Sequence, residues 1–200
     1  MPSRRTTRVN PEPTAKAEAA KTALSQFFTT KGGPWGKCFL PRTEGERRYW
    51  LVKSEPDVFS WQDLLSAPKR TTHWNGVRNF AARNFMRDGM KKGDRVFFYH
   101  SNADPSSIVG VCEVAREAYP DHTAFEAGHH GYDEGSSPDH PTWFMVDLRA
   151  VESLPRPVAL PMLKSSQSLK RMALIRTGRL SVTPVSALEW DTILAMGQDR

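Results

Sequence analysis

The feature of this sequence that most constrains its fold is an abrupt change in composition at Tyr49. Residues 1–48 carry ten Lys and Arg against four Glu, and they are rich in Pro, Thr, Ala and Lys without a sustained apolar period. The other 152 residues carry 18 basic and 18 acidic side chains, so the net charge of +6 lies entirely in the first segment. So little apolar surface cannot offset the entropy of ordering a backbone. We therefore predict a basic, disordered arm over 1–48 and a folded domain over 49–197.

The arm is open to several interpretations. Its alanines and lysines favour a short helix from about Thr14 to Phe28, and GGPWG at 32–36 ends any regular element there. Its composition fits a basic tail that attracts nucleic acid, a transit-peptide-like leader or a bland extension. With only Cys38 and Cys112 and no CxxC, the chain has no disulfide scaffold, which indicates a reducing compartment. No apolar stretch approaches the roughly 18 to 20 residues that cross a bilayer, so we expect no membrane partner.

From Tyr49 onward, short aromatic and β-branched runs alternate with turns and helix caps. Capping-box patterns at Ser60 and Ser186 and a possible cap at Asn79 each predict a helix, and Pro68 ends the first of them. The expected strands are 49–53, 95–100, 108–116, 143–151 and 179–185, with a long loop over 117–141 and a short helical segment near 162–165. Strands joined through hairpins without regular βαβ alternation favour an α+β fold over a doubly wound sheet.

The most informative motif for function is HWNGVRN at 73–79. The indole of Trp74 can stack on a base for about 1 to 3 kcal/mol, and Arg78 and Asn79 can bond to base edges or phosphate. The Asn-Gly pair turns the backbone just before the expected helix, whose free N–H groups favour an anion. A buried tryptophan beside a capped helix and a solvated arginine explains the same residues, and spacing alone favours that alternative.

Two further clusters of polar residues follow predicted strands. The first comprises Tyr99, His100, Ser101 and Asn102, and the second is KSEP at 53–56. Loops held by rigid strands commonly carry binding residues, so both clusters can line the mouth of a pocket. In isolation, a structural role explains each cluster equally well.

Together these motifs resemble the EVE domain family. The resemblance covers about 48–196, with its motifs in the same order over that length, and leaves out the arm. Its residues are YWLVKSEP at 49–56, HWNGVRN at 73–79 with Ala82, Arg83 and Asn84, FYHS at 98–101, IVG at 108–110, EAYPD at 117–121, WFMVD at 143–147 and GRLSV at 178–182.

The resemblance implies a PUA-like fold, a small, strongly bent β-barrel with flanking helices. It also implies a non-catalytic protein that binds DNA or RNA carrying modified bases, such as methylated or hydroxymethylated cytosine, without a cofactor. The family's pocket, carried over motif by motif, would consist of Lys53, Ser54, Trp74, Val77, Arg78, Asn79, Tyr99, His100, Ser101, Arg179 and Ser181, with Trp143 as a less certain member. We expect a monomer, located in the cytoplasm of a bacterium or the nucleus of a eukaryote.

Elementary energetics set what such a pocket must do. A base read with its modification must leave the stack, which costs a few kcal/mol, and we expect Trp74 to supply the stacking plane. One buried methyl group gains only about 0.8 kcal/mol, so strong discrimination needs polar groups that the wrong base leaves unpaired. Ser54, Asn79 and His100 are the candidates. Because the domain is neutral, we expect the arm's cations to supply most of any salt-dependent affinity.

Three other functions remain open from the residues. A hydrolase could use Ser54 or Ser101 with His73 or His100 as base, although nothing resembles a nucleophile elbow. A metal site could draw on the loop residues His122, His129, His130 and His140 with Asp121, Asp133 and Asp139, but they lack the spacing of structural zinc ligands. The third alternative is a partner-binding barrel that has lost its ligand.

Overall fold

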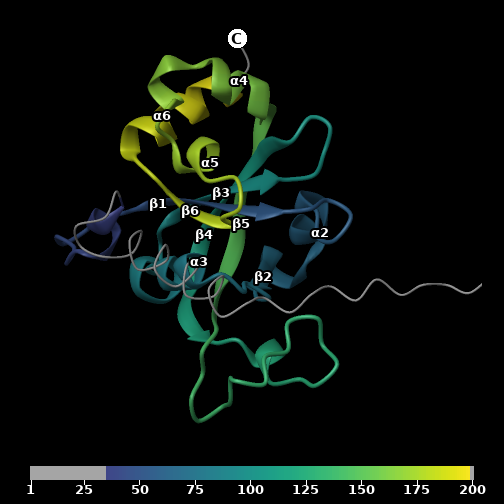
Figure 1. Ribbon diagram of the computed structural model, residues 1–200. Coiled ribbons are helices and arrows are strands. Elements are labelled where there is room, and N and C mark those ends of the chain that lie inside the picture. The colour runs from purple at the N-terminus through teal and green to yellow at the C-terminus, as the bar shows by residue number, and fades with distance from the viewer. Residues whose placement is uncertain (1–34, 199–200) are drawn as a thin grey trace, which may run out of the picture.

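Six strands pair in the order β2-β5-β4-β3-β1-β6 in the computed structural model, which describes residues 35–198 (Figure 1). The strands are β1 (Tyr49–Ser54), β2 (Thr71–Trp74), β3 (Arg95–His100), β4 (Ser107–Pro120), β5 (Phe144–Ala159) and β6 (Val182–Val185). The α-helices are α2 (Trp61–Ser66), α3 (Phe80–Asn84), α4 (Leu160–Ser165), α5 (Ala173–Arg176) and α6 (Ala187–Gly197). Single turns complete the chain at η1 (Gly36–Phe39), η2 (Pro68–Arg70), η3 (Phe85–Gly89), η4 (His122–Ala124) and η5 (Gln167–Leu169).

The sheet is mixed and open. β1 runs parallel to β3, and the other pairs are antiparallel. Within the described residues, the four-residue strands β2 and β6 form the two edges and each pairs on one side only. The α+β class and the PUA-like architecture are thus confirmed, but the prediction of a β-barrel is wrong because the two edges do not meet. Four register shifts between β4 and β5 mark bulges, which bend strands locally.

Each face of the sheet covers its own apolar core. Successive side chains of a strand point to opposite faces, so Trp50 and Val52 of β1 join one core while Leu51 joins the other. The first core packs against α2 and α3. The second packs against the helices at the carboxyl end of the chain, where Trp190 stacks on Phe97 with ring centroids 3.9 Å apart. This division decides which residues can share a site.

The predicted helix caps are confirmed. Ser60 and Ser186 each form a capping box with the acidic residue three positions later, and the Asn79 side chain accepts from two backbone N–H groups of α3. The sequence pattern missed β2, α5 and the extension of β5 to Ala159. Pro155 and Pro157 lie between the paired residues Ser153 and Val158, where a bulge requires no ladder donor.

Residues 35–48, which the sequence analysis assigns to the arm, pack on the domain. Arg42 donates to both oxygens of the buried Asp94 at 2.5 and 2.7 Å, and Trp50 Nε1 donates to the same carboxylate at 2.8 Å. Phe39 stacks on Phe85 with ring centroids 5.6 Å apart. The helix expected over 14–28 lies outside the described residues. Over 35–198, none of the helices combines the length and apolar character that crossing a bilayer requires.

Candidate nucleotide pocket

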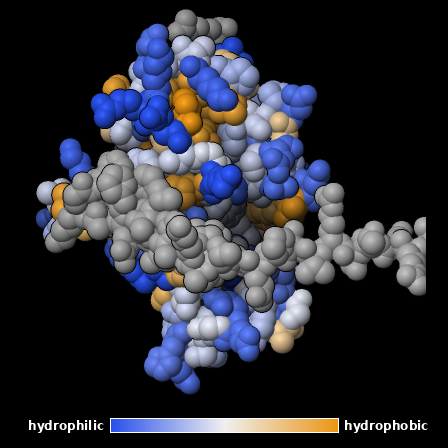
Figure 2. Space-filling view, in the orientation of Figure 1, coloured by the Kyte–Doolittle hydropathy of each residue, from blue (hydrophilic) through white to orange (hydrophobic). Residues whose placement is uncertain are grey.

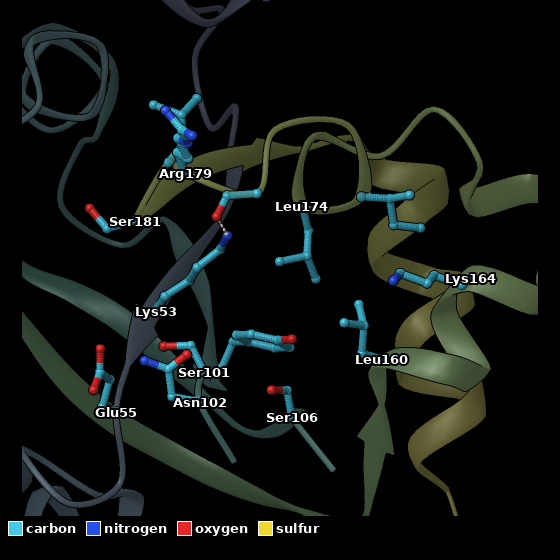
Figure 3. A pocket seen from close by; sticks show the side chains of 14 residues that line it. Lys53, Glu55, Ser101, Asn102, Ser106, Leu160, Lys164, Leu174, Arg179 and Ser181 are labelled. Atoms are coloured by element: carbon cyan, nitrogen blue, oxygen red, sulfur yellow. Dashed lines mark hydrogen bonds between the residues drawn. The ribbon is translucent and has the colours of Figure 1, made fainter. Parts of the chain in front are cut away.

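A cavity of about 510 Å³ opens where the parallel strands β1 and β3 end (Figure 3). Four groups of residues line it: Lys53 and Tyr99 on the strands, Glu55, Ser101, Asn102 and Ser106 on loops, Leu160, Lys164, Leu174 and Ile175 on α4 and α5, and Gly178, Arg179, Leu180 and Ser181 on the turn before β6. The volume lies within the range of small-molecule sites, and the lining combines apolar side chains with a few polar groups. The cavity can therefore accept a flat heterocycle.

The side chain of Lys53 extends from β1 along the cavity toward the turn before β6. Its ammonium donates to the carbonyl oxygen of Gly178 at 2.9 Å, as the dashed line in Figure 3 marks. This bond uses one of the three donors of the ammonium, and two remain for a ligand. Burial lowers the pKa of Lys53, because an ammonium is less stable away from water.

Among the described residues that line the cavity, Tyr99 is the only aromatic one. Register pairs it with Lys53, so the two side chains leave the same face of the sheet. Burial raises the pKa of the Tyr99 phenol, which a hydrogen bond with Ser106 partly opposes. In Figure 3, the side chains of Leu160 and Leu174 lie on the side of the cavity opposite Lys53 and Ser101. The cavity therefore has an apolar wall beside its donors and acceptors.

The cavity brings together five of the eleven residues predicted for the site. They are Lys53, Tyr99, Ser101, Arg179 and Ser181. The sequence analysis did not include Ser106, Leu160, Lys164, Leu174 and Ile175, and it named Glu55 and Asn102 only as members of their clusters. Most of these lie on α4, α5 and their connections, where the only signal was the short helical segment near 162–165.

Ser54 and His100 leave the opposite face of the sheet. Ser54 Oγ donates to the carbonyl oxygen of Phe59 at 2.6 Å, and His100 Nε2 accepts from the backbone N–H of Trp61 at 3.0 Å. Burial lowers the pKa of His100, and the bond from Trp61 requires an unprotonated Nε2. Both side chains therefore hold the start of α2 in place.

Trp74 and Val77 are part of the first core. Trp74 is 8% exposed, and its ring meets Phe98 edge-on with centroids 5.6 Å apart. Tyr99 belongs to the core on the other face, so Trp74 and Tyr99 do not face one another across a shared slot. The structure thus separates the indole from the cavity. A contact between Trp74 and a base stays a prediction.

Arg78 connects distant segments of the chain, whereas Asn79 caps α3 locally. Arg78 donates to Asp121 at 2.7 Å, to Thr123 Oγ1 at 3.1 Å and to the Gly131 carbonyl at 2.6 Å. Burial alone would raise the pKa of the fully buried Asp121, but bonds from Arg78, Thr123 and the Gly76 N–H hold it below its usual value. HWNGVRN thus orders the loop that follows β4, which is the structural alternative for this motif.

The catalytic and metal alternatives gain no geometric support from the described residues. Ser54 donates to a backbone carbonyl, and His100 accepts from a backbone amide, so neither is held as a nucleophile with its base. His73 lies near Asp147 and Tyr119, with Nδ1 3.2 Å from the carboxylate and 3.0 Å from the phenol oxygen. Over 35–198, the His, Cys, Asp and Glu side chains form no group of three suited to a metal ion.

An open, bent sheet with a core on each face and a cavity at the ends of β1 and β3 defines a PUA-like domain. The profile of the EVE domain family matches residues 48–196, and the chain belongs to that family. It is 44% identical over 200 residues to rat thymocyte nuclear protein 1, covering 92% of this chain and 86% of the relative. It is 42% identical over 165 residues to the human protein of that name, covering 74% and 73%.

Solved structures agree with this assignment. Human THYN1 in complex with DNA containing 5-methylcytosine superimposes with a TM-score of 0.74 at 42% identity, covering 76% of this chain and 99% of that one. A hypothetical protein from Leishmania major gives a TM-score of 0.73 at 43% identity, covering 78% and 97%.

Proposed function

We propose that this protein is a non-catalytic reader of DNA that carries a modified cytosine. The observation that carries the proposal is the similarity to human THYN1, whose structure contains DNA with 5-methylcytosine and matches this chain over 99% of its own length and 76% of this one. The cavity supports it, because a base that has left the duplex needs an enclosed site with edge hydrogen bonds and a flat apolar wall. RNA with a modified base is the alternative target.

We propose that Lys53, Tyr99, Ser101, Arg179 and Ser181 contact the extruded nucleotide. Lys53 can donate to the acceptor edge of cytosine, and hydroxyl groups can pair with its exocyclic amine. Contact of the modification with Leu160 or Leu174 contributes about 0.8 kcal/mol per methyl group, roughly fourfold in affinity. In this proposal, the other six predicted residues support the walls and loops: Ser54, Trp74, Val77, Arg78, Asn79 and His100.

The protein holds its ligand without chemical change in this proposal. The support is that two of the candidate side chains, Ser54 and His100, are occupied by backbone bonds. We propose that it acts as a monomer, located in the nucleus if the cell is eukaryotic, in keeping with its similarity to thymocyte nuclear protein 1.

The test is an affinity panel with the full chain. Single- and double-stranded DNA and RNA of one sequence would carry cytosine, 5-methylcytosine or 5-hydroxymethylcytosine at one position. We expect tighter binding of modified DNA, and a loss of about tenfold in Lys53→Met, equal to about 1.4 kcal/mol. Lys37→Met is the control, because Lys37 is exposed and does not line the cavity. Equal wild-type affinity for all three bases would overturn the proposal.

A further inference from the structure

The neutral domain separates its charges along the chain. The segment 160–180, here called the cap, comprises α4, η5, α5 and the turn before β6 and contains no Asp or Glu. Its five cations are Lys164, Lys170, Arg171, Arg176 and Arg179. The loop 121–142 has the opposite composition, with five Asp and Glu and no Lys or Arg. Figure 1 shows the cap at one end of the molecule and this loop at the other.

The cap's cations face solvent without acidic partners. All five are exposed, and none is in an ion pair with a described residue. By contrast, Arg42, Arg78 and Arg149 are each paired with a carboxylate. Like charges concentrated on one surface raise the local potential and attract an anion.

The cap is continuous with the cavity. Lys164 and Arg179 belong to the cap and also line the cavity. In Figure 2, hydrophilic side chains surround a hydrophobic patch in the upper part of the molecule, where Figure 1 places α4, α5 and α6. A polymer that enters the cavity with one base therefore places its neighbouring phosphates near the cap.

We propose that the cap binds the phosphodiester backbone on either side of the nucleotide held in the cavity. This inference rests on the proposed function, because the cavity fixes where the strand enters. The cap, and not the basic segment 1–34, then supplies most of the salt-dependent affinity. Each phosphate neutralised on duplex DNA contributes about −0.9 to the slope of log K against log salt, so five contacts contribute at most about −4.5.

The test compares three variants of the full chain. The cap variant replaces Lys164, Lys170, Arg171 and Arg176 by Gln and keeps Arg179, which the proposed function places against the nucleotide. The matched control replaces four exposed cations outside the cap, none in an ion pair with a described residue: Arg47, Lys69, Arg70 and Lys92. The third replaces the six cations of 1–34, which are Arg4, Arg5, Arg8, Lys16, Lys21 and Lys31. Binding of duplexes with cytosine or 5-methylcytosine would be measured from low to physiological salt.

We expect the slope of log K against log salt to become less steep, by about three in the cap variant and by less than about one in the other two. The ratio of affinities for modified and unmodified duplex should stay unchanged, because none of the replaced cations is among the side chains proposed to contact the base or its modification. An unchanged slope in the cap variant, or an equal loss in either comparison variant, overturns the inference while the proposed function stands. A wild type that binds both duplexes equally, with its slope still lost in the cap variant, overturns the base-reading function and supports the cap.

Discussion

The cap at 160–180 and the loop at 121–142 both carry charges of a single sign, but their charges face different partners. In the loop, Asp121 is buried against Arg78, and Asp133 accepts from Trp143 Nε1 at 2.5 Å. In the cap, all five cations are exposed without an ionic partner among the described residues. Asp121 and Asp133 of the loop thus bind partners within the protein and stabilise its structure. The cations of the cap instead form an exposed, positively charged surface that is free to bind a ligand.

If the residues at the loop end of the molecule serve the fold and not the ligand, substitutions there should lower the free energy of unfolding more than the free energy of DNA binding. Trp74→Ala has the largest expected effect, about 3 to 5 kcal/mol in the free energy of unfolding, because it removes a buried ring packed on Phe98. Denaturant unfolding measures it. Tyr132→Ala, at an exposed loop residue, is the control and should change stability by about 0.5 kcal/mol or less.

Binding assays on a milder variant of the same residue, Trp74→Phe, address the base-stacking prediction. Trp74→Phe retains much of the packing, and we expect its folded form to bind modified DNA with nearly wild-type affinity. A tenfold loss of affinity at little cost in stability would instead place the indole against the base, as the sequence analysis predicted.

The bond between Arg78 and Asp121 gives the second largest expected effect. Asp121→Asn should lower the free energy of unfolding by about 3 kcal/mol, because the arginine loses its buried carboxylate partner. Asp139→Asn, at an exposed position of the same loop, should be nearly neutral. Equal stability of the two variants would show that the loop is not fastened in this way.

The same pair makes stability depend on pH. Because the folded pKa of Asp121 lies below its ordinary value of 3.8, its contribution is complete above that pH and is lost as pH falls through the folded pKa. Acid unfolding of wild type should therefore be steeper than that of Asp121→Asn over this range.

His100 predicts a smaller effect, in a different pH range. Burial lowers its folded pKa below 6.5, so the bond from Trp61 contributes fully above pH 6.5 and is lost as pH falls through the folded pKa. The expected loss is about 1 kcal/mol, the value of one hydrogen bond. Urea titrations from pH 7.5 to 5 should show it in wild type and not in His100→Gln. Its persistence in the variant would assign the pH dependence to other groups.

The sequence predicted the regular elements well wherever local chemistry decides them. Ser60, Asn79 and Ser186 cap helices through atoms within three residues, so their signals are local. β2 was missed because Thr71–Trp74 becomes a strand only by pairing with the distant β5. The closed barrel was wrong for a related reason: closure depends on how the edge strands meet, which no local pattern encodes.

The lining of the cavity was predicted in part, because strand alternation divides adjacent residues between two faces. Lys53 and Tyr99 reach the cavity, whereas their neighbours Ser54 and His100 turn to α2. Residues that are neighbours in one sequence motif thus lie on different faces of the sheet, some in the cavity and some against α2. The missed residues Lys164 and Leu174 carry no motif, and only the packing of α4 and α5 over the sheet brings them to the cavity.

The smallest expected effect comes from removing exposed acidic charges of the loop and measuring the affinity for DNA bound at the cap. Glu134→Gln with Asp139→Asn removes two exposed negative charges at the end of the molecule away from the cap. At physiological salt, screening acts over about 8 Å, so DNA bound at the cap should gain less than about twofold in affinity. At about 0.01 M salt the screening length is about 30 Å, so the negative charges of the loop repel the bound DNA over a longer distance. The gain in affinity should therefore be larger at this salt concentration. A large gain already at physiological salt would mean that the DNA runs along the loop, and would move the binding surface away from the cap.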